Sequence, residues 1–261
     1  MCDYIVYCYG YICFYFNHPI KYFKVTFMLI GGIQEFTTLD FPGKLATVVF
    51  TAGCNFRCGY CHNPQFVDEE QIKNIIADCI PEEAFFKFLE KRKGKLEGVC
   101  ISGGEPTLHS DLIDFAFKIK QAGYLVKLDT NGTKPVILEK MIAEKLVDFF
   151  AMDIKTSLAR YQEIIKTGFS ADDIKKSKEI IQNSGLPYEF RTTAVKGTHT
   201  KEIFEEIGEW LKGSEAYFIQ NFRNKKVLAE DYAQKEGFFE KELNEFKTLM
   251  LKYVKNCEIR M

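Results

Sequence analysis

The sequence has little excess charge and no long apolar segment, and each absence excludes a class of function. Lysine and arginine number 35 against 36 for aspartate and glutamate, so the formal net charge is −1. A chain so close to neutral has no overall electrostatic attraction to nucleic acid or to an anionic membrane. The apolar-aromatic stretch Tyr4–Phe16 has 13 residues, whereas a spanning helix needs roughly 20. We therefore expect no nucleic-acid partner and no membrane partner.

Residues 1–27 differ from the rest of the chain and lack the marks of a targeting segment. Ten of them are Tyr or Phe, a composition that favours strands. No Lys or Arg precedes the apolar stretch and no small-residue cleavage pattern follows it, so a signal peptide is not indicated. We expect residues 1–27 to be an extension without a role and Met28 to be the working start. Residues 28–261 are then expected to form one domain, since single α/β barrel domains commonly run to about 200–250 residues.

Short β-rich runs alternate with helical patterns from Met28 onward. Continuous apolar runs, such as Ala-Thr-Val-Val-Phe, are typical of strands buried on both faces of a parallel sheet. Strands that alternate with helices indicate right-handed β-α-β units and hence an α/β fold, although the periodicity leaves open whether the sheet closes. Ser110 is expected to cap one helix. We expect a first strand at 28–36, further strands at 45–51, 98–102, 125–129, 149–154, 188–194 and 216–221, and helices at 81–93, 110–122, 135–145, 171–183, 201–211 and 241–254.

Nine cysteines are the unusual feature of the composition. An odd number in a chain of this length does not fit the disulfide framework of a small secreted domain, so a reducing compartment, the cytoplasm, and a metal or redox role are the better interpretation. Cys54, Cys58 and Cys61 lie in one short segment directly after a buried strand. Sites of parallel α/β folds gather at that end of the strands. Three thiolates at this spacing can turn toward one point, and thiolates are the usual ligands of iron–sulfur clusters.

Two other metal sites fit part of this segment. A zinc site would need His62 as its fourth ligand. The run from Cys58 to His62 also fits the attachment pattern of c-type haem, but that interpretation leaves Cys54 without a role. Three cysteine ligands leave one iron of a four-iron cluster open to an exogenous ligand, and we favour the cluster. Cys100 lies in an expected buried strand, where we expect it to behave as a small apolar side chain.

Three more motifs end the strands that follow the cysteines. The first is Ser102–Pro106, with the sequence SGGEP, whose glycines would let backbone approach a ligand closely. The second and third are Leu128–Gly132 (LDTNG) and Met152–Lys155 (MDIK). Their aspartates, Asp129 and Asp153, would repel each other on neighbouring strand ends. The lysine of the third motif or a bound monovalent cation would offset that repulsion.

With these motifs, residues 28 to 225 resemble the radical S-adenosylmethionine (SAM) superfamily. Within it, the Tyr60-Cys61-His62-Asn63 run looks like the glycyl-radical-enzyme activases. The stretch 31–64, with its Asp-Phe-Pro-Gly sequence at 40–43, looks like the anaerobic ribonucleoside-triphosphate reductase activating proteins. This resemblance implies a partial (β/α)6 TIM-type barrel that binds one [4Fe–4S] cluster and SAM.

The resemblance also implies roles for single residues. The three cysteines would hold the cluster, Glu105 would receive the methionyl amine of SAM, and Lys155 would bind its carboxylate as a flexible point charge. Related activases place a monovalent cation at carboxylates such as Asp129 and Asp153. Arg191 would reach the SAM carboxylate or the backbone of a partner, or form an ordinary ion pair. The residues expected at the SAM site are Tyr60, His62, Gly103, Gly104, Glu105, Asp129, Asn131, Asp153, Lys155 and Arg191.

The function implied is that of an activase. With an electron from a flavodoxin- or ferredoxin-type donor, it would cleave SAM reductively to give a 5′-deoxyadenosyl radical. This radical would take a hydrogen atom from a glycine of a partner enzyme, and the partner we favour is anaerobic ribonucleoside-triphosphate reductase. The main alternative is a radical SAM enzyme for a small molecule, like a 7-carboxy-7-deazaguanine synthase. A peptide-modifying enzyme would usually carry further C-terminal cysteines, which Cys257 alone does not supply. His109 and His199 have no motif around them, and we expect both at the surface or at caps.

Overall fold

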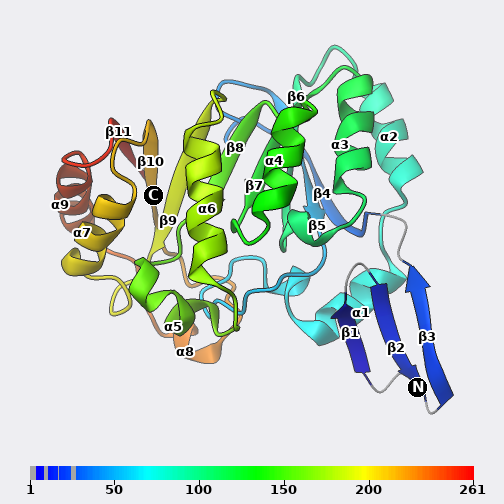
Figure 1. Ribbon diagram of the computed structural model, residues 1–261, viewed down its shortest axis with the longest axis horizontal. Helices are drawn as coiled ribbons and strands as arrows, with labels where there is room; N and C mark the ends of the chain where they lie inside the picture. The colour runs from blue at the N-terminus through cyan, green and yellow to red at the C-terminus, as the bar shows by residue number, and fades with distance from the viewer. Residues whose placement is uncertain (1–3, 9–10, 17, 25–27) are drawn as a thin grey trace.

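The computed structural model describes residues 4–8, 11–16, 18–24 and 28–261. Its main sheet has eight strands in the order β11-β10-β9-β8-β7-β6-β5-β4 (Figure 1). β4 (Ile30–Thr37) is antiparallel to β5 (Ala46–Thr51), and every following pair of neighbours is parallel. Among the described strands, β4 and β11 form the two edges and do not pair with each other, so the barrel stays open between them.

The strands follow one another in chain order, with helices in between, as right-handed crossover connections require. The other strands of the main sheet are β6 (Gly98–Gly103), β7 (Leu125–Thr130), β8 (Phe149–Asp153), β9 (Tyr188–Ala194), β10 (Ala216–Asn221) and β11 (Asn256–Arg260). The helices are α1 (Glu69–Ala77), α2 (Glu82–Lys91), α3 (Leu112–Gln121), α4 (Pro135–Ala143), α5 (Tyr161–Ile165), α6 (Ala171–Gln182), α7 (Lys201–Trp210), α8 (Glu230–Ala233) and α9 (Glu240–Met250). A separate antiparallel sheet holds β1 (Tyr4–Cys8), β2 (Tyr11–Phe16) and β3 (His18–Lys24).

Helices cover the outer face of the sheet, and α3, α4 and α6 lie in front of it in Figure 1. α3 shows why: its buried residues Leu112, Phe115, Ala116 and Ile119 recur at helical spacing and form one apolar stripe. A small apolar cluster elsewhere in the sheet includes Cys100, which is fully buried, so its expected behaviour as a small apolar side chain is confirmed. None of the helices that the structure describes combines the length and apolarity needed to cross a membrane.

The predicted elements and the observed ones agree along most of the chain. The six strands expected between 45 and 221 correspond to β5 through β10, and the expected first strand to β4. The sheet has one more parallel strand than expected, β11, and helices α1, α5 and α8 were also missed. The expected cap at Ser110 is wrong, because the N-cap residue of α3 is Asp111, whose side chain makes no capping hydrogen bond.

Candidate active site

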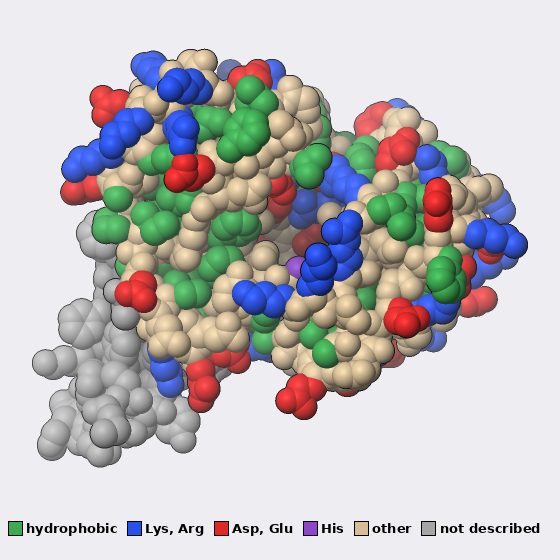
Figure 2. Space-filling model, turned by 180° about the vertical axis from the view of Figure 1, so that it is seen from behind, with side chains coloured by type: hydrophobic (Ala, Val, Ile, Leu, Met, Phe, Trp, Pro, Cys, Tyr) green, Lys and Arg blue, Asp and Glu red, His purple; other side chains and the backbone are tan. Residues whose placement is uncertain are grey.

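A cavity of about 360 Å³ lies where the parallel strands end, a volume typical of a small-molecule site. On the face opposite to that of Figure 1, the surface is hollowed, with Lys, Arg and His side chains around the hollow (Figure 2). The structure brings together at this cavity all the residues expected to hold the cluster and SAM. They are Cys54, Cys58, Tyr60, Cys61, His62, Gly103, Gly104, Glu105, Asp129, Asn131, Asp153, Lys155 and Arg191.

The three cysteines lie in the loop that leaves β5, and all three are free thiols. Burial raises the pKa of Cys54 and Cys61, and it raises that of Cys58 to about 11 although the Lys155 ammonium opposes the shift. Among the described residues, no three His, Cys, Asp or Glu side chains are gathered closely enough to hold a single metal ion. A four-iron cluster bonds each thiolate to a different iron, so it does not require the thiols to meet at one point. Three free thiols at one cavity, that of Cys58 buried and the other two partly buried, fit such a group, whose iron takes the place of the thiol protons.

Gly103 and Gly104 bring the loop after β6 against the cysteine loop. The Gly104 N–H donates to Thr51 O at 2.9 Å, and the Glu105 N–H donates to Gly53 O at 2.7 Å. A Cβ on Gly104 would stand 1.9 Å from Gly53 O, and one on Gly103, whose φ is +118°, would stand 2.3 Å from Thr51 N. The backbone of these glycines therefore lies close to the end of β5 and to the cysteine loop, which leaves room for glycine only, and the close approach expected toward a ligand stays a prediction.

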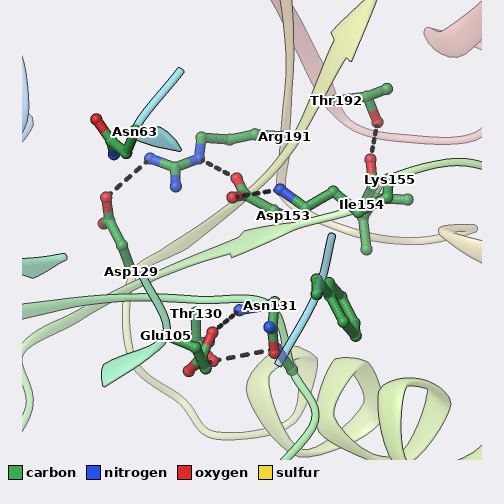
Figure 3. A network of polar contacts seen from close by, with 12 residues as sticks. Asn63, Glu105, Asp129, Thr130, Asn131, Asp153, Ile154, Lys155, Arg191 and Thr192 are labelled. Atoms are coloured by element: carbon green, nitrogen blue, oxygen red, sulfur yellow. Dashed lines mark hydrogen bonds and ion pairs between the residues drawn. The ribbon is translucent and has the colours of Figure 1, made fainter. Parts of the chain in front are cut away.

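Glu105 joins the motif of β6 to that of β7. Its side chain is 1% exposed. One carboxylate oxygen accepts from Thr107 N and Oγ1 at 3.1 and 2.5 Å and from Thr130 Oγ1 at 2.8 Å, and the other accepts from Asn131 N at 2.6 Å (Figure 3). Burial raises the pKa of Glu105, and these hydrogen bonds oppose the rise. Both oxygens are thus already held by protein donors, and its expected contact with the methionyl amine stays a prediction.

Asn131 ties the end of β7 to the cysteine loop. Its side-chain amide donates to Asn55 Oδ1 at 2.7 Å, and Asn55 donates in turn to Thr133 Oγ1 at 2.7 Å. Asn131 Oδ1 accepts from the N–H and hydroxyl of Thr133 at 3.1 and 2.8 Å. The side chain therefore holds Cys54 in place through its neighbour Asn55. Sequence reasoning did not single out Asn55, although it lies between two expected ligands.

Asp129 and Asp153 share one cation, Arg191 of β9 (Figure 3). Arg191 Nη1 lies 3.3 Å from Asp129 Oδ2, and its Nε donates to Asp153 Oδ1 at 2.9 Å. Lys155 Nζ donates to the other oxygen of Asp153 at 3.0 Å, and Lys127 Nζ donates to Asp129 Oδ1. Burial alone would raise the pKa of both carboxyls, but these cations hold each pKa below its usual range. Of the three roles left open for Arg191, the structure shows the ion pair.

The ion pairs around Arg191 continue along the sheet, past β10, to β11. Glu189 of β9 is 1% exposed and accepts two hydrogen bonds from Arg260, at 2.8 and 2.7 Å. Arg191 Nη1 also lies 3.8 Å from Glu189, and the Arg260 guanidinium lies 3.7 Å from the centre of the Phe218 ring. This extension was missed, because it depends on a strand that the sequence did not reveal.

The histidines without a motif are not alike. The expectation that His199 lies at the surface or at a cap is wrong: it is 2% exposed, its Nε2 lies 2.9 Å from Lys155 O, and the N-cap of α7 is Thr200. The expected cap is confirmed for His109, which is the C-cap residue of a short 3-10 helix (Pro106–Leu108) and whose Nε2 lies 3.0 Å from Ala52 O. His62 is exposed, and its ring stacks on Phe222 with the centroids 5.6 Å apart.

The fold and this cavity define a class of protein. Residues 48–211 match the family model of the radical SAM superfamily, and the chain belongs to that superfamily. A protein of Methanocaldococcus jannaschii named as a glycyl-radical enzyme activating enzyme is 34% identical over 89% of this chain and 95% of its own length. The pyruvate formate-lyase-activating enzyme of Streptococcus mutans is 33% identical over 74% of this chain and 75% of its own length. The chain is thus a radical SAM enzyme of the kind that activates glycyl radical enzymes, and membership implies a [4Fe–4S] cluster and SAM.

Solved structures share the fold at lower identity. A domain of pyruvate-formate lyase-activating enzyme from Bacteroides vulgatus aligns with a TM-score of 0.52 and 18% identity, over 63% of this chain and 99% of that domain. Streptococcus suis SuiB, solved with its precursor peptide SuiA, aligns with a TM-score of 0.61 and 15% identity, over 81% of this chain and 48% of that protein. These likenesses confirm the α/β partial barrel.

Proposed function

We propose that this enzyme installs a glycyl radical on anaerobic ribonucleoside-triphosphate reductase. The observation that carries the activase chemistry is the meeting of three free thiols, one buried and two partly buried, with Lys155 and the Asp129–Arg191–Asp153 ion pairs in one cavity. The choice of partner rests on the resemblance of residues 31–64 to the activating proteins of that reductase. Pyruvate formate-lyase is the competing partner, because several relatives are named for it.

Different residues of the cavity bind the cluster and SAM in this proposal. Cys54, Cys58 and Cys61 hold the cluster, and Lys155, whose side chain is 18% exposed, offers its ammonium to the SAM carboxylate. When bound, the cluster supplies the electron that cleaves SAM to methionine and the 5′-deoxyadenosyl radical, which takes a hydrogen atom from a glycine of the partner. The protein orients and shields these groups, and none of its side chains needs to act as a general acid or base.

A monovalent cation at Asp129 and Asp153 is not required in this proposal. Lys127, Arg191 and Lys155 already contact the two carboxylates. A further cation would be repelled by these three positive charges unless it displaced one of the side chains from its buried ion pair. Such a displacement is costly, because it leaves a buried charge without its partner.

The electron donor is proposed to be an acidic flavodoxin- or ferredoxin-type protein. Arg223, Lys225 and Lys226 are exposed on the loop that follows β10. This loop lies against the cysteine loop, since the N–H groups of residues 228 and 229 donate to Gly59 O at 3.1 and 3.0 Å. Complementary charge speeds the encounter of such partners. Free cysteines and an iron–sulfur site favour a reducing compartment, and we propose the cytoplasm.

Low-temperature electron paramagnetic resonance (EPR) on the anaerobically reconstituted enzyme tests the proposal. A reduced four-iron signal that changes when SAM is added is expected from wild type and from Cys257→Ala, a matched control at a buried cysteine of β11. Cys58→Ala should lose both the signal and SAM cleavage, and retained cleavage would overturn the cluster assignment. A glycyl radical signal on the purified reductase is then expected. A signal formed only on pyruvate formate-lyase would overturn the choice of partner.

A further inference from the structure

Lys155 lies just beyond the end of β8, where the hydrogen bonds of the sheet end. The last registered pair of β8 and β9 joins Asp153 to Arg191. At Lys155, side chains and not a neighbouring strand are the hydrogen-bond partners of the backbone: the Lys155 N–H donates to the Tyr161 hydroxyl at 3.1 Å. The Lys155 carbonyl accepts from the Tyr60 hydroxyl at 3.2 Å and lies 2.9 Å from His199 Nε2. Both peptide groups that flank the Lys155 Cα are therefore held by ring-bearing side chains.

The hydrogen bonds of His199 define where its proton lies. The Val195 N–H donates to His199 Nδ1 at 3.1 Å, so Nδ1 carries a lone pair. Burial lowers the pKa of His199, so the ring is neutral and its single proton is on Nε2. That N–H points at the Lys155 carbonyl. The ring is also confined by Tyr60 and Phe204, whose centroids lie 6.1 and 6.2 Å away.

We propose that Tyr60 and His199 are positioning residues that hold the Lys155 peptide so that its ammonium faces SAM. The proposal rests on the function proposed above for Lys155. A lysine side chain loses much rotamer freedom when it is fixed by a ligand. A rigid peptide fixes the position of the Lys155 Cα before the ligand binds, so less conformational freedom is lost on binding.

The same contact links Lys155 to the cluster loop. Tyr60 lies between Cys58 and Cys61 in the chain, and its hydroxyl donates a hydrogen bond to the Lys155 carbonyl. A shift of the cysteine loop therefore acts on the lysine through one oxygen atom. The arrangement assigns to Tyr60 a role in orienting Lys155, which the sequence motif alone did not specify.

Two substitutions of His199 separate its two hydrogen bonds. In His199→Asn, the amide oxygen can take the place of Nδ1 and accept from Val195, but no donor reaches Lys155. In His199→Gln, the amide nitrogen can take the place of Nε2 and donate to Lys155. Tyr60→Phe removes the second donor, and Tyr124→Phe is its matched control, because that buried hydroxyl also donates to a carbonyl, Leu89 O at 2.6 Å, away from the cavity.

The measurement is the dissociation constant of S-adenosylhomocysteine, which has the methionyl amine and carboxylate but no sulfonium to cleave. Calorimetry on the reconstituted variants should show about fivefold weaker binding for His199→Asn and Tyr60→Phe, the effect of one lost hydrogen bond. His199→Gln and Tyr124→Phe should stay within about twofold of wild type. Equal constants for the Asn and Gln variants would overturn the proposal, whatever their melting temperatures.

A double-mutant cycle excludes a merely structural role. In a Lys155→Met background, His199→Asn should weaken binding no further, because the side chain that it positions is gone. An equal loss in both backgrounds would overturn the proposal. Wild type that binds no S-adenosylhomocysteine would instead refute the proposed function, so the two failures are distinguishable.

Discussion

Gly104→Ala should both destabilise the protein and displace the cluster loop. The new Cβ would stand 1.9 Å from Gly53 O and 2.5 Å from Gly53 C. Because real Cβ contacts essentially never fall below 3.0 Å, one loop must move by at least the difference between 3.0 and 1.9 Å, which is 1.1 Å. Overpacking of this kind costs about 1–3 kcal/mol. The movement also strains the 2.7 Å hydrogen bond from Glu105 N to Gly53 O, worth about 1 kcal/mol.

The expected loss is therefore about 2–4 kcal/mol in the free energy of unfolding, measured by urea titration of the cluster-free protein. Since Gly53 precedes Cys54, iron and sulfide content after reconstitution should fall as well. Gly168→Ala is the matched control, because a Cβ there meets nothing within 4 Å and its φ is not positive. The reasoning is refuted if Gly104→Ala unfolds like Gly168→Ala and takes up the same amount of iron.

Three further predictions concern the charges. Arg191→Met should cost about 2–4 kcal/mol in urea unfolding, less than a fully broken buried pair, because two lysines still contact Asp129 and Asp153. Asp129 and Asp153 have lowered pKa values in the folded protein, so the stabilisation from their ion pairs is complete above the unfolded pKa of about 3.9 and is lost as pH falls toward the folded pKa values. The difference in unfolding free energy between wild type and Arg191→Met should therefore shrink below about pH 4. A difference that stays constant with pH would contradict an origin in these ion pairs. Lys225→Glu with Lys226→Glu should raise the KM for an acidic donor protein about tenfold at low salt and leave dithionite-driven SAM cleavage unchanged; equal effects with both reductants would exclude a docking role.

The fold was predictable where a strand is buried on both faces. β5 and β6 read as continuous apolar runs because helices and barrel interior enclose them. β11 gave no such signal, since it lies at an edge and, of its five residues, only Cys257 is buried. α1 could have been found from the sequence, because Asp68 caps it by accepting from Gln71 N and Ile72 begins its apolar face.

The site was predictable as a set of residues but not as a set of contacts. Strand ends of a parallel sheet share one edge, which is why the motifs met in one cavity. Which side chains touch depends on register, and the pairing of Asp153 with Arg191 is not readable from spacing. That register decides a functional question: Arg191 forms ion pairs with three carboxylates, those of Asp129, Asp153 and Glu189, whereas among the described residues Lys155 pairs only with Asp153. Lys155 is therefore the cation whose removal should weaken SAM binding most.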